Sequence, residues 1–263
     1  MVTTLRIDFF EEFPTDENLQ KAALVDFKST VFLAARSMQE FREAQRRLKR
    51  VNPSLEAAYW PLLPRSYWIS PFSSTPELKH LIEELRETGG LEVLIDLELP
   101  FLSPKLFLVN LPRFFQNKRL IGEILAESGR LGVRICTAEY ALPLGAEELL
   151  KWAGVSYSLQ RFPHTRLIMF YTSMMPPMLR GMLEDTIIRN SRRWGKRFGV
   201  GLGTIARGIL GTEPILTPGE LERDLRFLER VGVGRAVIFR LGGLDEEYSK
   251  ILRRYAMGQG GEG

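Results

Sequence analysis

The chain has 263 residues, of which 44% are hydrophobic and 26% charged, and its formal net charge is +4. This balance is ordinary for a globular protein and excludes a disordered chain. The surplus of Lys and Arg is spread over many segments, so it does not indicate a dedicated nucleic-acid-binding protein. No uninterrupted apolar run is long enough to cross a bilayer, and no membrane span is predicted.

Cysteine usage and the first residues bear on the cellular compartment. Cys136 is the single cysteine, so an intramolecular disulfide is excluded. Residues 5–10 follow the first methionine almost at once and lack the basic start and long apolar region of a signal peptide. We therefore expect a cytoplasmic protein, with export by another route left open.

Apolar strand-like runs alternate with helix-like stretches along the whole chain, the pattern of an α/β protein with a parallel sheet. The predicted strands are residues 5–10, 30–35, 56–62, 91–99, 133–140, 166–172, 198–205 and 235–241. The predicted helices are residues 16–26, 38–50, 76–88, part of a long segment that contains 119–130, 146–153, 178–193, 219–231 and 245–255. Eight such pairs in about 250 residues predict a single (β/α)₈ barrel over residues 1–257, followed by a flexible Gly-rich tail at 258–263.

The fourth predicted strand carries two carboxylates, Asp96 and Glu98, just before Pro100. Side chains alternate across a strand, so both carboxylates point the same way. Neighbouring like charges shift each other's pKa, which is one way to keep a carboxylic acid protonated near neutral pH. Glu98 is therefore a candidate general acid at the carboxyl-terminal face, where barrel enzymes place their chemistry. The alternative is a hydrated strand end without a catalytic role.

An aromatic segment and a methionine segment each allow two interpretations. Residues 59–72 carry Tyr59 and Trp60 among several aromatics and prolines. Flat aromatic faces on a stiff loop suit stacking against sugar rings, and the alternative is a loop that buries its own aromatics. Residues 174–178 read Met-Met-Pro-Pro-Met and are either an apolar lip or core filling.

Three strand segments together carry a family resemblance. Residues 93–100, Val-Leu-Ile-Asp-Leu-Glu-Leu-Pro, resemble the strand-four signature of family-18 glycoside hydrolases, the chitinase-like barrels. Met169-Phe170-Tyr171 is similar to the Met-x-Tyr of that family, and residues 237–243 resemble its strand-eight segment. The chain departs from the pattern at Leu94, where the family has an acid, at Thr172, where Asp is usual, and at Arg240, where the family has a tryptophan.

The resemblance implies substrate-assisted retaining hydrolysis of an N-acetylated amino-sugar glycan. Glu98 would protonate the glycosidic oxygen, and Asp96 would orient the acetamido group of the substrate as it attacks the anomeric carbon. Tyr171 would hydrogen-bond to that group. Arg240 in place of the tryptophan suggests an anionic group on the ligand, which a guanidinium grips bidentately. The predicted substrate-binding residues are Asp8, Tyr59, Trp60, Met169, Arg240 and Glu139.

Two other functions stay open. The first is a non-catalytic barrel of the same fold that binds a carbohydrate or a protein. The second is a divalent-metal-dependent sugar isomerase, in which Asp8, Glu98 and Glu139 would converge as oxygen ligands. The preferred interpretation needs neither a cofactor nor a metal, and its expected partner is a carbohydrate.

Overall fold

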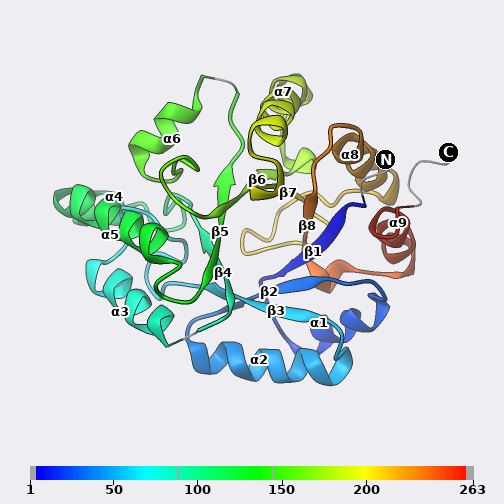
Figure 1. Cartoon of the computed structure of the whole chain (residues 1–263), viewed down its shortest axis with the longest axis horizontal. Coiled ribbons are helices and arrows are strands. Elements are labelled where there is room, and N and C mark those ends of the chain that lie inside the picture. Colours follow the sequence, from blue (N-terminus) through cyan, green and yellow to red (C-terminus); the bar gives the residue numbers. More distant parts are fainter. Residues whose placement is uncertain (1–3, 88, 144, 259–263) are drawn as a thin grey trace.

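The computed structural model describes residues 4–87, 89–143 and 145–258, so positions 259–263 of the expected tail lie outside the described residues. Eight parallel strands close into a barrel in sequence order, and the helices surround it (Figure 1). The predicted (β/α)₈ fold is confirmed. The strands are β1 (Arg6–Glu11), β2 (Thr30–Ala35), β3 (Glu56–Pro61), β4 (Glu92–Asp96), β5 (Arg134–Tyr140), β6 (Thr165–Phe170), β7 (Phe198–Gly203) and β8 (Arg235–Phe239).

The helices follow the strands and pack on the outside of the barrel (Figure 1). They are α1 (Asp16–Gln20), α2 (Met38–Val51), α3 (Thr75–Arg86), α4 (Lys105–Asn110), α5 (Phe114–Glu127), α6 (Glu147–Ala153), α7 (Pro177–Trp194), α8 (Pro218–Arg230) and α9 (Glu246–Ala256). None of the helices in the described ranges is both long and apolar enough to span a membrane. Local chemistry explains several boundaries; at α8, Thr217 and Glu220 cap each other's backbone N–H groups.

One predicted boundary and one unpredicted helix differ from the expected structure in ways that matter for the site. The fourth strand ends at Asp96 instead of residue 99, because Leu97 pairs with Ile69 of the preceding loop and Pro100 then turns the chain. The sequence pattern also missed α4, a short helix without the polar face that marks an amphipathic helix. The segment after β4 is therefore a structured excursion from the barrel.

Alternation along the strands divides the core into two layers. Side chains such as Phe9 and Ile95 point outward and pack under the helices. Their neighbours Phe10 and Leu94 point inward, where they fill the barrel together with Cys136. This alternation decides which residues near a strand end can reach an interior site.

Buried ion pairs close the amino-terminal end of the barrel. Arg235, the first residue of β8, donates from Nε to Asp8 Oδ2 at 2.6 Å and from Nη1 to Glu92 Oε1 at 2.6 Å. Arg6 Nε lies 3.0 Å from the same Asp8 oxygen, and the backbone N–H of Thr30 donates to the other at 2.7 Å. Each of these carboxylates has a cation beside it, so this end of the barrel is a paired, structural layer.

Candidate active site

A cavity of about 350 Å³ opens at the carboxyl-terminal end of the barrel, where the strands meet their following loops. Most of its lining is apolar or aromatic, and none of the described residues that line it is a Lys, Arg or His. The cavity is therefore an apolar space whose ionisable groups are all acidic or phenolic. Its polar side chains are Glu12, Asp96, Glu98, Tyr140, Tyr171, Thr204 and Glu213.

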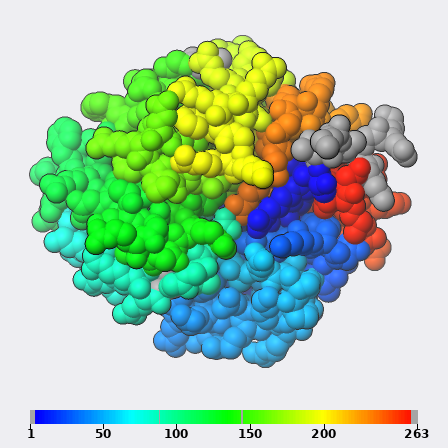
Figure 2. Space-filling view, in the orientation of Figure 1, coloured from blue at the N-terminus to red at the C-terminus, as the bar shows by residue number. Residues whose placement is uncertain are grey.

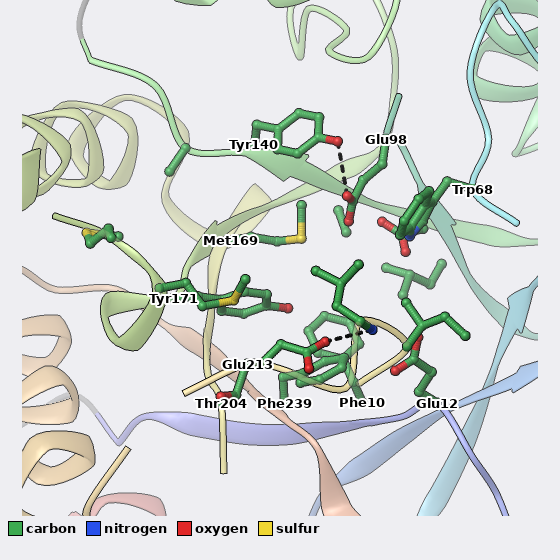
Figure 3. Close-up of a pocket in the computed structure, with 18 of the residues that line it drawn as sticks. Phe10, Glu12, Trp68, Glu98, Tyr140, Met169, Tyr171, Thr204, Glu213 and Phe239 are labelled. Atoms are coloured by element: carbon green, nitrogen blue, oxygen red, sulfur yellow. Dashed lines mark hydrogen bonds between the residues drawn. The ribbon is translucent and has the colours of Figure 1, made fainter. Parts of the chain in front are cut away.

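Asp96 and Glu98 bring two interacting carboxyl groups into this cavity. Glu98 is labelled in Figure 3. Burial raises the pKa of Asp96 well above its usual value, and the negative charges of Glu98 and Glu12 raise it further. Burial also raises the pKa of Glu98 to about 7, although a hydrogen bond from Tyr140 opposes the shift. The pair therefore retains a proton near neutral pH, as a general acid requires.

Tyrosines lie on both sides of the cavity. The Tyr140 hydroxyl donates to Glu98 Oε2 at 3.0 Å and fixes that carboxyl group. Tyr171 lies opposite, with its hydroxyl directed toward the centre of the cavity and Met169 between the two rings (Figure 3). Burial raises the pKa of Tyr171 well above its usual value, so its hydroxyl remains a neutral hydrogen-bond donor.

Several buried polar atoms of the cavity lack a hydrogen-bond partner. Trp60 Nε1 lies close enough to Asp96 to lower the pKa of that carboxyl group, yet it makes no hydrogen bond of good geometry. Asp96 Oδ1 is likewise unpaired. Unpaired buried polar atoms cost free energy. A ligand that offers both an acceptor and an N–H donor, as an amide does, would satisfy this donor and this acceptor.

Five of the predicted site residues line the same cavity, and the structure brings them together from the ends of three strands, β3, β4 and β6. Leu94, at the position where the family has its first acid, also lines it, so the floor is apolar there. The Met-Pro segment contributes to the rim through Met174, Met175 and Pro176, which agrees with the lip interpretation. The five predicted residues are Trp60, Asp96, Glu98, Met169 and Tyr171.

Tyr59 and Glu139 do not reach the cavity, because their positions along the strands turn them outward. Tyr59 packs against Phe41, with ring centroids 5.2 Å apart, and its hydroxyl donates to Glu84 at 2.8 Å. Glu139 accepts a hydrogen bond from Thr137 and pairs with Arg166 at 3.0 Å. Both side chains therefore lie in the layer between the strands and the helices.

Asp8 and Arg240 are also directed elsewhere. Asp8 points into the barrel, but at its amino-terminal end, where Arg235 and Arg6 neutralise it. Arg240 follows β8 and pairs with Glu11 at 3.1 Å, while its Nε donates to the backbone oxygen of Arg207. The Arg240 guanidinium thus connects the end of β1 to the loop after β7 and does not line the cavity. An anionic ligand would therefore find no cation in the described lining.

Glu12, Tyr140 and Thr204 also line the cavity, although the sequence pattern assigned them no role. Glu213 and Phe239, for which the sequence indicated no role, line the cavity as well. Alternation could have found Phe239, since Val237 and Phe239 share the inward side of β8. Glu213 lies in the irregular segment between β7 and α8, where no sequence period indicates orientation.

No cluster of three or more His, Cys, Asp or Glu side chains within residues 4–87, 89–143 and 145–258 is arranged to hold a metal ion. The three oxygen ligands expected for a metal-dependent isomerase lie in separate regions. Glu98 lines the cavity, Asp8 lies at the opposite end of the barrel, and the side chain of Glu139 on β5 points out of the barrel toward Arg166. These residues do not converge on one ion.

Fold and site together define a (β/α)₈ barrel with a buried carboxyl pair at the carboxyl-terminal end of β4. No family model matches the chain, and no curated sequence matches it at a significant level.

Solved structures share the fold at low sequence identity. The Bacillus cereus spore cortex-lytic enzyme SleL has a TM-score of 0.59 at 10% identity, with 97% of this chain and 75% of SleL covered. A chitinase from Chromobacterium violaceum has a TM-score of 0.57 at 11% identity, with 95% and 98% covered. A xylose isomerase domain protein from Planctomyces limnophilus has a TM-score of 0.55 at 10% identity, with 97% and 96% covered. At these identities the similarity establishes the barrel fold alone.

Proposed function

We propose that this protein is a glycoside hydrolase-like barrel that acts on an N-acetylated amino-sugar glycan by substrate-assisted, retaining hydrolysis. The observation that carries the proposal is the Asp96–Glu98 pair, which is buried with raised pKa values in a cavity whose described lining holds no cation. Fold similarity to chitinases is consistent with it, but similarity to a xylose isomerase domain protein is of the same order. Fold similarity therefore does not distinguish a hydrolase from an isomerase, and the proposal rests on the side chains that line the cavity.

The proposed reaction uses Glu98 twice. Protonated Glu98 donates its proton to the glycosidic oxygen while the acetamido carbonyl oxygen of the substrate attacks the anomeric carbon and the glycosidic bond breaks. The leaving alcohol departs with the proton, and a cyclic oxazolinium ion remains. A water molecule then attacks the anomeric carbon, gives its proton to the Glu98 carboxylate and reopens the ring, so the original configuration is retained.

Asp96 and Tyr171 have supporting roles in this scheme. An acetamido N–H directed at Asp96 favours the ionised form of that carboxyl group, which leaves the shared proton on Glu98. The Tyr171 hydroxyl, on the opposite side of the cavity, is a neutral donor for the acetamido oxygen. Apolar lining residues such as Phe239 and Met169 exclude water and supply surface for the pyranose ring.

Turnover of chromogenic oligomers of N-acetylglucosamine tests the proposal. We expect Glu98→Gln to lower kcat by about 10²- to 10⁴-fold. Glu87→Gln, at an exposed position directly after α3, is the matched control and should keep wild-type activity. Oligomers of glucose, which lack the acetamido group, should not be cleaved. If wild type and Glu98→Gln release chromophore at the same background rate while both bind the oligomer, the protein is a non-catalytic carbohydrate-binding barrel.

A further inference from the structure

Large apolar side chains are exposed on one side of the molecule, on the segments that follow β4 and β5. Leu108 is 79% exposed and Phe115 81% exposed, and Trp152 on α6 is 71% exposed. Helix α4 is apolar on both its inner and outer sides, since Leu108 and Val109 point out while Phe107 packs inward against Phe72. A helix of this kind on a protein surface is covered in function. We call this surface the α4–α6 face: Phe101, Leu102, Leu108, Val109, Leu111, Phe115, Leu149 and Trp152.

Ring contacts join the segments of the α4–α6 face into one continuous surface. Phe114 contacts Phe115 and Trp152, with centroids 5.2 and 6.0 Å apart, and Phe72 lies 5.3 Å from Phe114 and 4.7 Å from Phe107. The segments coloured cyan-green to green form the left side of the molecule in Figure 2. The face is thus supported from below by packed aromatic rings.

The charges around the α4–α6 face are mostly positive. From Leu99 to Gly122 the sequence has no Asp or Glu but has Lys105, Arg113, Lys118 and Arg119. Lys105 and Arg113 are exposed and form no ion pair within the described part of the chain. The acidic groups at the edge are already engaged. Arg119 pairs with Glu123, Lys151 pairs with Glu148, and Glu147 accepts a hydrogen bond from Asn190.

We propose that the α4–α6 face docks on the surface of an anionic phospholipid bilayer. Exposed Leu, Phe and Trp side chains insert at the boundary between headgroups and acyl chains, and unpaired Lys and Arg side chains contact the phosphates. A protein partner would need to supply acidic groups at both unpaired cations, whereas an anionic bilayer presents them everywhere. This proposal does not depend on the proposed function.

Docking in this way would place the cavity beside the bilayer. Phe101 at the start of the face contacts the ring of Tyr140, with centroids 6.5 Å apart, and Tyr140 holds Glu98. The face therefore begins at the rim of the cavity, and substrates carried on the bilayer surface would lie within reach of the carboxyl pair.

Co-sedimentation with vesicles tests the proposal. The vesicles are phosphatidylglycerol mixed with phosphatidylcholine, and phosphatidylcholine alone. We expect wild type to bind the anionic vesicles at least tenfold more strongly, with binding that falls as salt is added. The double variant Leu108→Ser, Val109→Ser should lose at least tenfold in partitioning. Lys105→Gln with Arg113→Gln should lose roughly fivefold per cation removed.

Matched controls remove groups of the same kind elsewhere. Met257→Ser removes another half-exposed apolar side chain, and Lys28→Gln with Arg42→Gln removes two exposed cations outside the α4–α6 face, one before β2 and one on α2. Both should bind like wild type, and circular dichroism should show every variant folded. Absence of binding to anionic vesicles, or equal binding by all variants, overturns the proposal. A concentration-dependent dimer that Leu108→Ser, Val109→Ser abolishes, without vesicle binding, assigns the face to a second copy of the chain instead.

Discussion

Both ends of the barrel bury carboxyl groups, but they treat the negative charge differently. At the amino-terminal end, Asp8 has Arg235 at 2.6 Å and Arg6 at 3.0 Å. At the carboxyl-terminal end, Asp96 and Glu98 have each other, Glu12 and a tyrosine hydroxyl, and no described Lys, Arg or His lines their cavity. The carboxylates at the amino-terminal end have cations beside them and belong to the structural layer of the barrel. The Asp96–Glu98 pair has no cation beside it in the described lining, and its raised pKa values keep a proton that can be transferred.

The largest expected effect is on turnover and comes from Asp96, at the carboxyl-terminal end of the barrel. We expect Asp96→Asn to lower kcat by about 10²- to 10⁴-fold with little change in KM, because the substrate still binds but its acetamido group is no longer oriented. The free energy of unfolding should stay the same or rise, because a buried like-charge interaction is removed. Steady-state kinetics and urea unfolding measure the two quantities. Loss of stability with full activity would contradict the assigned role.

At the amino-terminal end of the barrel, we expect a substitution to lower stability and leave turnover unchanged. Arg235→Met leaves Asp8 and Glu92 without their shared cation, so the free energy of unfolding should fall by about 3–5 kcal/mol. Turnover per folded molecule should not change, because the cavity lies at the other end. Adding Asp8→Asn and Glu92→Gln to the same chain should recover part of the stability. A kinetic defect without a stability defect would break the distinction between the two ends.

The free energy of unfolding should depend on pH through the buried Glu98 carboxyl group. Glu98 has a pKa of about 7 in the fold and a usual value of 4.5, so between these values the unfolded chain is ionised while the folded chain keeps its proton. The unfolded state then binds fewer protons, and stability declines as pH rises through this window. Glu98→Gln should flatten part of that decline and raise the thermal midpoint above pH 7, but not below pH 4.5. Identical profiles would show that Glu98 titrates normally.

The smallest expected effect is a shift of the activity profile. The hydrogen bond from Tyr140 lowers the pKa of Glu98, so Tyr140→Phe should raise it by about one unit. The alkaline limb of kcat/KM should move upward by the same amount, because the general acid then stays protonated to higher pH. Tyr157→Phe, which removes a hydroxyl bonded to a backbone oxygen outside the barrel, is the control and should leave the limb in place.

The barrel and the fourth-strand pair were accessible from sequence because each depends on local periodicity. Apolar runs marked all eight strands, and the spacing of Asp96 and Glu98 placed both on one side. The roles of Asp8 and Glu139 depended on depth and on side. Asp8 points into the barrel but lies at its amino-terminal end, far from the cavity. Glu139 points out of the barrel on the same side of β5 as Thr137. Residues of irregular loops, such as Glu213, have no period from which orientation could be predicted.

Cys136 has a practical consequence for labelling. It is the single cysteine, it is buried inside the barrel, and burial raises the pKa of its thiol. A thiol that is both inaccessible and protonated reacts slowly with alkylating reagents. A cysteine introduced on the surface, for example Leu108→Cys, would therefore be modified selectively in the native background. An environment-sensitive dye at that position would report directly whether the surface enters an apolar phase.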